Sequence, residues 1–593
     1  MSLAFASFLT LAYFVLSVLG VLTAIAFATD AASLGVMIVL TILINLAVWF
    51  IAPWITDFIM RWAYSMRFLE DAEARAQPWW AFVERVCSEH KIKPPRFGVI
   101  DDANPTAFTY GSTANRARVV ITRGLVNDLS RPELEAVIGH ELGHIVNRDF
   151  IVMTMASTLL QILYQLYAFC ARAAQASNRG SGKNKGQAAA ALYLIGLGAL
   201  LLYAIGTYLL LYLSRTREYM ADEFSARATG DGNLLSTALL KVAYGIAAAP
   251  DTEQTAHLLR ATRAQGLIDV AQARGPALVH ANARDDVPTI ERALLFDMVS
   301  PWAWLVQFSS THPLIGRRLE RLMRFTQRPR FDFERIKTQA VDRGRLYAGF
   351  TRDLTIYLLP WGAIALLAVL VLVHLLAPQL GVMPIGAVVF VAVFAVGVWL
   401  RLRMRYPGGE FPPGDVMTCL ADVYASPVRG RPVALSGAAI GRGTAGYILS
   451  EDMMFRDRSG LIFLNYESGI PIFGNLYFAW KKLQPLIDRP AVASGWFLRG
   501  ATHHLELHRF EADGQTIKSR VKLWSVIGAV LAILLAVVVA IGASAAAVAI
   551  DRARPVIPLI RDTAPPPGMP VPPARVDDNK GPGAGAAPPA AGK

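Results

Sequence analysis

Long apolar runs alternate with polar segments along this chain. A membrane-spanning helix needs about 20 mostly apolar residues, and about seven runs reach that length. The first run lacks the basic segment that precedes the apolar part of a signal peptide, and a second run follows directly. The pattern predicts a polytopic α-helical membrane protein, with spans near residues 8–28, 32–53, 152–174, 188–213, 354–376, 382–400 and 523–550.

A shorter helical pattern precedes the third run. In "LSRPELEAVIGHELGH", apolar residues recur at helical spacing and predict a helix with one buried face. Ser130 can cap this helix, Pro132 suits its first turn, and Glu133 completes a Ser-x-x-Glu capping box. His140 and His144 are four residues apart, so both lie on the same side of the helix.

Two further regions have the shorter period of β-strands. Residues 106–111 and 117–122 are β-prone and flank a turn-like connection, so their edge could bind an extended peptide through its backbone. Residues 401–520 alternate short apolar runs with Gly, Asp and Ser turns, which predicts a small antiparallel, barrel-like β domain. The tail from about residue 551 is rich in Pro, Ala and Gly and is expected to be disordered.

Composition agrees with a membrane protein. Hydrophobic residues make up 54% of the 593 residues, and the mean hydropathy is +0.38. The net charge of +13 would suit nucleic acid, but zinc-finger spacing and RNA-binding signatures are absent, so we expect no nucleic-acid partner. Lys and Arg beside apolar runs instead indicate segments that face cytoplasm and anionic lipid.

The distribution of basic residues predicts the orientation. The regions 54–151 and 214–353 are rich in Arg, and placing them in the cytoplasm satisfies the positive-inside rule. Residues 171–187 disagree, because they carry four basic residues and no acidic one yet fall on the outer side, unless the hairpin 152–213 does not fully cross. The three cysteines are far apart, as expected of reduced thiols on the cytoplasmic side. The composition suggests a bacterial inner membrane.

The two histidines of the capped helix predict a zinc site. Their imidazoles can reach one ion, and Glu141 can sit beside the open coordination position and accept a proton from water. Only 10 of the 593 residues are His, which makes a chance His-Glu-x-x-His unlikely. A catalytic zinc needs a third protein ligand, and Glu218 is the best candidate. Asp222, one turn further on, could hydrogen-bond a ligating histidine.

Three motifs together resemble one family. "HELGHIVNRD", "SRTREYMADEFSA" and "STHPLIGRRLERL" are similar to the integral-membrane zinc metallopeptidases that include the HtpX heat-shock protease and the CAAX prenyl protease. "NPTAFTYG" further resembles the HtpX branch, and the resemblance covers roughly residues 60–325 and the two leading spans. It implies a mostly helical zincin-like (α+β) peptidase domain that binds one Zn²⁺ per chain.

The resemblance also implies roles for individual residues. His140, His144 and Glu218 would bind the metal, and Glu141 would be the general base. His312 would approach the substrate carbonyl or stabilise the site, or else belong to a packing motif at a helix start. The remaining residues that the resemblance places around the site are Asn147, Asp149, Asp222 and Arg318.

The position of the apolar runs indicates the substrates. The third run starts shortly after His144 and the fourth ends shortly before Glu218, so the zinc would lie about 10 Å from the bilayer surface. Quality-control cleavage of membrane or misfolded proteins is therefore favoured over digestion of free peptides. The β domain and the last span extend beyond the short HtpX pattern and could bind substrate, an adaptor or a regulator.

Other motifs are weaker candidates. His504, Glu506 and His508 alternate as on one face of a strand, where a polar outer face is more common than a metal site. His374 lies inside an apolar run, where a neutral histidine bonded within a bundle is the plainer explanation. "GRGTAG" lacks the helix and lysine of a phosphate-binding loop.

Together these expectations predict a polytopic membrane zinc endopeptidase. Two alternative functions for the same fold are a CAAX-type processing protease and a catalytically silent scaffold. A channel or transporter is disfavoured, since the runs contain few charges or Gly/Pro breaks.

The predicted domains are two spans in 1–55, a peptidase domain in 56–350 interrupted by the hairpin, two spans in 351–400, a β domain in 401–520, a span in 521–550 and the tail 551–593.

Overall fold

The computed structural model describes most of the chain. The described residues are 32–179, 185–248, 287–338, 341–442, 453–470, 473–478, 481, 484–500 and 503–553. The expected span at 8–28 and nearly all of the expected disordered tail lie outside them. Six described helices are long and apolar enough to cross a membrane: Ile42–Tyr64, Asp149–Ser177, Ala188–Thr229, Arg343–Leu376, Met383–Arg405 and Val521–Arg552.

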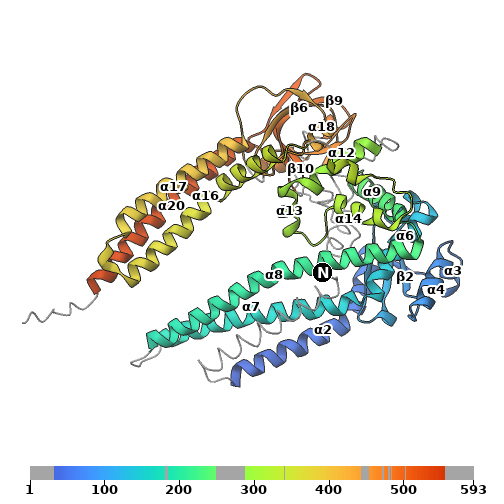
Figure 1. Ribbon diagram of the computed structural model, residues 1–593, viewed down its shortest axis with the longest axis horizontal. Coiled ribbons are helices and arrows are strands. Elements are labelled where there is room, and N and C mark those ends of the chain that lie inside the picture. The colour runs from blue at the N-terminus through green and yellow to red at the C-terminus, as the bar shows by residue number, and fades with distance from the viewer. Residues whose placement is uncertain are drawn as a thin grey trace, which may run out of the picture.

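These helices form two bundles, which extend to the left from the folded domains in Figure 1. The first bundle contains α2 (Ala32–Tyr64), α7 (Asp149–Arg179) and α8 (Lys185–Thr229). The second contains α16 (Arg343–Leu376), α17 (Met383–Arg405) and α20 (Val521–Ala553). Many large apolar side chains on them are exposed, such as Leu194 at 70% and Leu535 at 63%. Such surfaces suit contact with lipid, and the chain is a polytopic membrane protein.

The helix α8 extends beyond the apolar run that the sequence predicts as a span. The fourth apolar run was expected to end near residue 213, but the helix continues to Thr229 without interruption. No Gly or Pro lies between Thr207 and Thr229, so nothing breaks the backbone pattern there. Gly230 follows with φ +80°, which ends the helix. One helix therefore runs from the apolar bundle into the polar region around Glu218.

A small sheet and several helices form the domain at the right-hand side of Figure 1. The sheet order is β1-β2-β4-β3, and β3 is antiparallel to β4 and forms the edge. The two strands fall in the runs 106–111 and 117–122 that the sequence predicts as β-prone. The strands are β1 (Arg67–Phe68), β2 (Arg96–Ile100), β3 (Ala107–Tyr110) and β4 (Arg118–Thr122). The helices are α3 (Asp71–Arg75), α4 (Trp80–Glu89), α5 (Arg123–Asp128), α6 (Arg131–Val146), α9 (Gly232–Ala248), α12 (Val287–Val299), α13 (Pro301–Phe308), α14 (Ile315–Leu322) and α15 (Phe333–Thr338).

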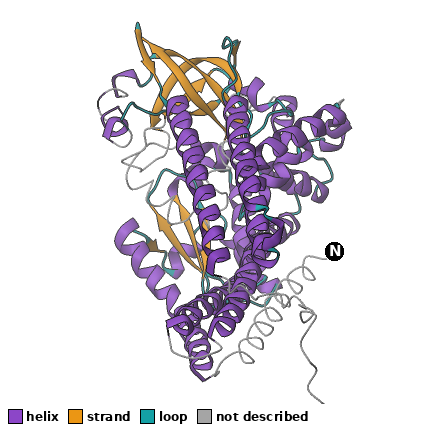
Figure 2. Ribbon diagram, turned by 90° about the vertical axis from the view of Figure 1, so that its left-hand side faces the viewer, coloured by secondary structure: helices purple, strands orange, loops and turns teal. Residues whose placement is uncertain are grey.

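The second sheet forms the C-terminal β domain, at the top of Figure 2. Strands β6, β7, β8, β10 and β9 pair in a closed ring, because β9 joins β10 to β6. The expectation of an entirely antiparallel domain was wrong, since β8 pairs with β10 in parallel. The elements are β5 (Pro413–Gly414), α18 (Val416–Leu420), β6 (Arg431–Arg442), β7 (Met453–Asp457), β8 (Leu461–Asn465), α19 (Phe473–Tyr477), β9 (Pro490–Arg499), β10 (His503–Ala512) and β11 (Gln515–Lys518).

Candidate functional site

The helix α6 carries the two histidines and begins as its sequence predicts. Glu133 Oε2 accepts hydrogen bonds from the backbone N–H and the hydroxyl of Ser130, both at 2.8 Å. Lys241 of α9 lies 2.7 Å from the same oxygen. Burial alone would raise the pKa of Glu133, but Lys241 and Ser130 outweigh that effect and lower the pKa. The start of the helix is therefore held by a buried carboxylate that stays ionised at neutral pH.

The helices α6 and α8 approach each other closely at Gly143. A Cβ atom at Gly143 would lie 3.0 Å from the Cα of Ala221 and 3.2 Å from the Cβ of Phe224. A larger residue would push the helices apart. The absence of a side chain at this position therefore lets His140 and His144 of α6 face Glu218 of α8.

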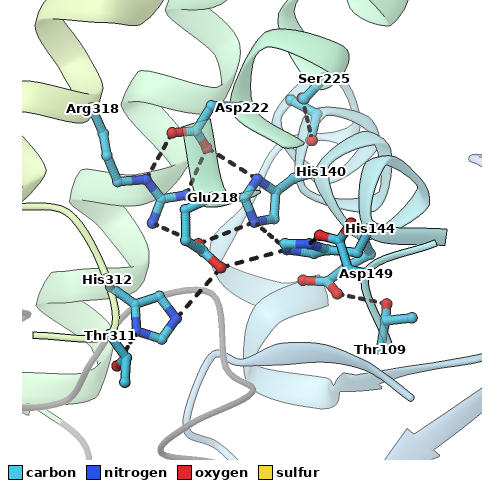
Figure 3. Close-up of polar contacts among 12 residues, drawn as sticks. Thr109, His140, His144, Asp149, Glu218, Asp222, Ser225, Thr311, His312 and Arg318 are labelled. Carbon is cyan, nitrogen blue, oxygen red and sulfur yellow. Dashed lines mark hydrogen bonds and ion pairs between the residues drawn. The ribbon is translucent and has the colours of Figure 1, made fainter. Parts of the chain in front are cut away.

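The three expected metal ligands converge, as Figure 3 shows. The Nε2 atoms of His140 and His144 are 3.2 Å apart, and each lies 3.6 Å from an oxygen of Glu218. One donor atom from each residue falls within 4.8 Å of the others. Glu218 Oε2 is buried and has no hydrogen-bond partner among the described residues. Two imidazoles and a buried carboxylate oxygen that makes no hydrogen bond to the described residues form a donor set that fits zinc.

A carboxylate lies beside the Nδ1 atom of each of the two histidine rings. His144 Nδ1 lies 2.6 Å from Asp149 Oδ2, and His140 Nδ1 lies 3.0 Å from Asp222 Oδ1. A carboxylate at Nδ1 keeps the proton on that nitrogen and leaves Nε2 free to bind a metal. Both expected supporting acids therefore lie where they can orient a ring. Asn147 contributes differently, since its backbone carbonyl accepts a hydrogen bond from Arg217 Nη2 at 2.8 Å.

A turn in the left-handed region brings Asp149 to His144. Arg148, between α6 and α7, has φ +57°, and α7 starts at Asp149. Arg217 of α8 is 4% exposed and forms an ion pair with Asp149. No sequence motif connects these two residues, because they lie far apart along the chain.

Arg318 compensates the buried acidic charge of the site. Its Nε and Nη2 donate to the two oxygens of Asp222 at 2.9 and 2.7 Å, and its Nη1 lies 3.8 Å from Glu218. Arg318 and Asp222 are each 1% exposed. Burial alone would lower the pKa of Arg318, but the neighbouring carboxylates raise it further above its usual range. The guanidinium is therefore permanently charged and holds Asp222 against His140.

His312 lies on the opposite side of Glu218 from the other histidines (Figure 3). Its Nε2 is 3.7 Å from Glu218 Oε1, and its Nδ1 is 3.0 Å from the hydroxyl of Thr311. The residue is 3% exposed and lies three residues before Ile315, the first residue of α14. The structure thus brings His312 to the candidate metal centre rather than leaving it only as part of a helix start.

Glu141 points toward the edge strand β3. Its Oε2 accepts a hydrogen bond of 2.6 Å from the hydroxyl of Thr109. Sequence reasoning identified the strand but missed Thr109, because only the fold brings residue 109 to residue 141. A cavity of about 470 Å³ borders Glu141, His144 and Glu218. Its far walls come from α2 and α7, with Asn45, Trp49, Pro53, Met153 and Ser157 among the lining residues.

The weaker candidates take other roles among the described residues, where His140, His144 and Glu218 form the one group close enough to hold a metal. Glu506 is 1% exposed and pairs with Arg405, while His508 stacks on Phe411 with ring centres 5.2 Å apart. Nε2 of His374 lies 3.4 Å from Asp551 of α20. Most of "GRGTAG" lies outside the described residues.

Comparison with known proteins identifies the family. Residues 74–326 match peptidase family M48. The protease HtpX homolog of Methanothermobacter thermautotrophicus is 35% identical over 192 residues, which cover 32% of this chain and 67% of that protein. The homolog of Thermococcus kodakarensis is 33% identical over 217 residues, which cover 35% and 71%. The chain belongs to peptidase family M48.

The family match has clear limits along the chain. The protease HtpX homolog of Aeropyrum pernix is 30% identical over 309 residues, covering 51% of this chain and 90% of that protein. Ste24p from S. mikatae, known from a crystal structure, aligns with a TM-score of 0.32 at 20% identity, over 54% of this chain and 65% of that one. The M48 match ends at residue 326, so the second bundle and the β domain lie beyond it.

Proposed function

We propose that this M48 metallopeptidase is a zinc endopeptidase that cuts membrane or misfolded proteins beside the cytoplasmic membrane surface. The convergence of His140, His144 and Glu218 next to the carboxylate of Glu141 carries the proposal. The HtpX-like relatives support it. Zinc, when bound by those three residues, supplies a Lewis acid that polarises the scissile carbonyl and acidifies water.

The residues of the chain provide the other parts of the reaction. Glu141, which is not among the three converging donors, accepts the proton of the attacking water and later passes it to the leaving amine. His312 faces the centre and is positioned to donate to the oxyanion that develops on the substrate carbonyl. Asp149 and Asp222 hold the imidazole rings in the orientation that the metal requires.

The cavity beside Glu141 supports membrane proteins as substrates. Its walls include residues of α2 and α7, and both helices belong to candidate membrane spans. A peptide that emerges beside the bilayer can therefore enter between these helices and lie along the edge of β3. Backbone pairing with an edge strand does not depend on side chains, which suits broad specificity.

The β domain is proposed as the place where an adaptor or regulator binds. The buried Arg499 of this domain contacts the peptidase domain, where its Nη2 donates a hydrogen bond to the carbonyl of Ala293 at 3.0 Å. The same guanidinium lies over the ring of Phe296, 4.7 Å from its centre. Because both partners belong to α12, a protein bound to this domain would act on the peptidase domain directly.

Metal removal tests the proposed function. Treatment of the detergent-purified protein with a zinc chelator is expected to stop degradation of an unfolded model protein, and added Zn²⁺ is expected to restore it. Bound zinc, quantified in the same sample, should fall from about one per chain to near zero and return. Protein that holds zinc but degrades neither unfolded nor membrane-protein substrates would instead support the catalytically silent scaffold.

Replacement of Thr109 tests how Glu141 is held. Thr109→Val removes the hydroxyl that donates to Glu141, so kcat is expected to fall about tenfold, since hydrogen bonds to charged groups are among the stronger ones. KM and bound zinc should change little, and Thr109→Ser should recover most of kcat. Thr113→Val is the control, because Thr113 begins a 3-10 helix without a side-chain capping bond. A rise in KM at unchanged kcat would contradict the assignment.

A further inference from the structure

A second cavity lies in the other bundle and shares no lining residue with the cavity beside Glu141. It has a volume of about 390 Å³, and residues of α16, α17 and α20 line it. Its lining residues on α17 and α20 lie toward the helix ends that reach the β domain, and Figure 1 shows these helix ends. Its walls are mainly apolar, and they include Ile364, Phe394, Val398, Ala529 and Ala532. None of its lining residues is acidic.

Arg401 is the unusual residue of this cavity. Its Nε and Nη2 atoms are buried and have no hydrogen-bond partner among the described residues. Its guanidinium carbon lies 4.5 Å from the centre of the Tyr357 ring, a contact that leaves the N–H donors unused. Buried N–H donors without an acceptor are costly, so a ligand that supplies acceptors to this half-buried arginine would be bound favourably.

The two neighbouring arginines on α17, Arg403 and Arg405, differ from Arg401 in their contacts and exposure. Arg405 also lines the cavity, but its Nε donates to Glu506 of β10 at 2.8 Å, so its charge is compensated within the protein. Arg403 is exposed and lies over the ring of Trp399, 5.3 Å from its centre. Arg401 is therefore the lining arginine at this helix end with buried donors that have no acceptor among the described residues.

The position of the cavity identifies the kind of ligand. Arg401 lies four residues before the end of the candidate span Met383–Arg405, and Ser525 lies near the start of α20. Tyr357 and Trp361, which are 41% and 58% exposed, mark the same level on α16. Arginine and aromatic residues at helix ends lie at the depth of lipid headgroups. The apolar walls continue from that level toward the middle of the bundle, where acyl chains would lie.

We propose that this cavity binds an acidic phospholipid, with its phosphate at Arg401 and an acyl chain along the apolar walls of α17 and α20. Phosphate oxygens at this guanidinium accept the hydrogen bonds that Nε and Nη2 do not make within the described protein, and they compensate its charge. Val428 of the β domain also lines the cavity. A bound lipid therefore bridges the second bundle and the β domain. The proposal does not depend on the peptidase activity.

Lipid retention by the whole protein tests this site. The full chain is reconstituted in nanodiscs of phosphatidylcholine mixed with phosphatidylglycerol, transferred to detergent, and analysed by native mass spectrometry. Wild type is expected to retain phosphatidylglycerol over phosphatidylcholine by about fivefold or more, which corresponds to one arginine at a membrane surface. Equal retention of the two lipids would overturn the proposal.

Matched variants distinguish the cavity from the general positive charge. Arg401→Gln should abolish the preference, whereas Arg403→Gln, an equal loss of charge on the same helix end, should keep it. Equal loss in both variants would overturn the proposal. Ala529→Leu, which fills the cavity and keeps Arg401, should also abolish the preference, and it covers the case in which Arg401→Gln fails to fold. Inorganic phosphate in excess should not displace the lipid, and displacement would show a small-anion site instead.

Discussion

Glu141→Gln is expected to lower the kcat of proteolysis by about 10²–10⁴-fold while bound zinc stays near one per chain. The amide has nearly the same shape as the carboxylate, but it cannot accept the proton of the attacking water. Glu141 is not among the three donors that converge on the candidate metal position, so its replacement should leave the metal in place. The measurement is degradation of an unfolded model protein, with zinc quantified in the same preparation.

A ligand variant provides the control for this result. Glu218→Ala removes one of the three converging donors and should lose both zinc and activity. The two variants therefore separate the base from the ligands. Loss of zinc in Glu141→Gln would show that Glu141 binds the metal, and full activity in that variant would show that another group accepts the proton.

The parts of the site that the sequence predicted are those fixed by local geometry. His140, Glu141 and His144 lie within two turns of one helix, and the capping box that begins this helix spans four residues, so their spacing is enough to place them. Glu218 was identified through its motif and a resemblance, and its approach to α6 depends on Gly143. The residues that the sequence alone could place together, His140, Glu141 and His144, are thus those close to one another along the chain.

The parts that the sequence missed depend on contacts between distant segments. Thr109 reaches Glu141 only because β3 forms the edge of its sheet beside α6, and Arg217 reaches Asp149 only because α8 runs unbroken past the apolar part. The parallel pairing of β8 with β10 is likewise invisible to a pattern of alternating residues, which is the same in parallel and antiparallel strands. Periodicity predicts elements, but not which elements pair.

The buried carboxylates of the site explain why Arg318 lies beside the candidate metal ligands. Without a metal, the buried carboxylates of Glu218 and Asp222 face two imidazoles and Arg318. Arg318 supplies a permanent positive charge, whereas the imidazoles must stay neutral at Nε2 to bind zinc. The ion pair with Asp222 therefore compensates a buried carboxylate without charging the histidines, which stay available to a metal.

Arg318→Met is accordingly expected to destabilise the protein by about 3–5 kcal/mol, because it leaves Asp222 as a buried charge without its main partner. The double variant Arg318→Met with Asp222→Asn should recover a large part of this loss, since the neutral amide needs no counter-charge and its oxygen can still accept from His140. The free energy of unfolding, measured for the metal-free protein in detergent, checks both.

Arg321→Met on the same helix is the matched control for this ion pair. The side chain of Arg321 is 32% exposed, and its Nη2 lies 3.7 Å from Glu223. A partly exposed pair of this kind contributes at most about 1 kcal/mol, so the control should remain close to wild type. The single variant Asp222→Asn completes the comparison. If the loss of stability in the double variant equalled the summed losses of Arg318→Met and Asp222→Asn, Arg318 would stabilise the site through packing rather than through the charge of Asp222.

Arg318 and Asp222 lie beside Glu218 and His140. A double variant that regains stability but does not bind zinc would therefore separate the role of this ion pair in folding from its role in holding the ligands.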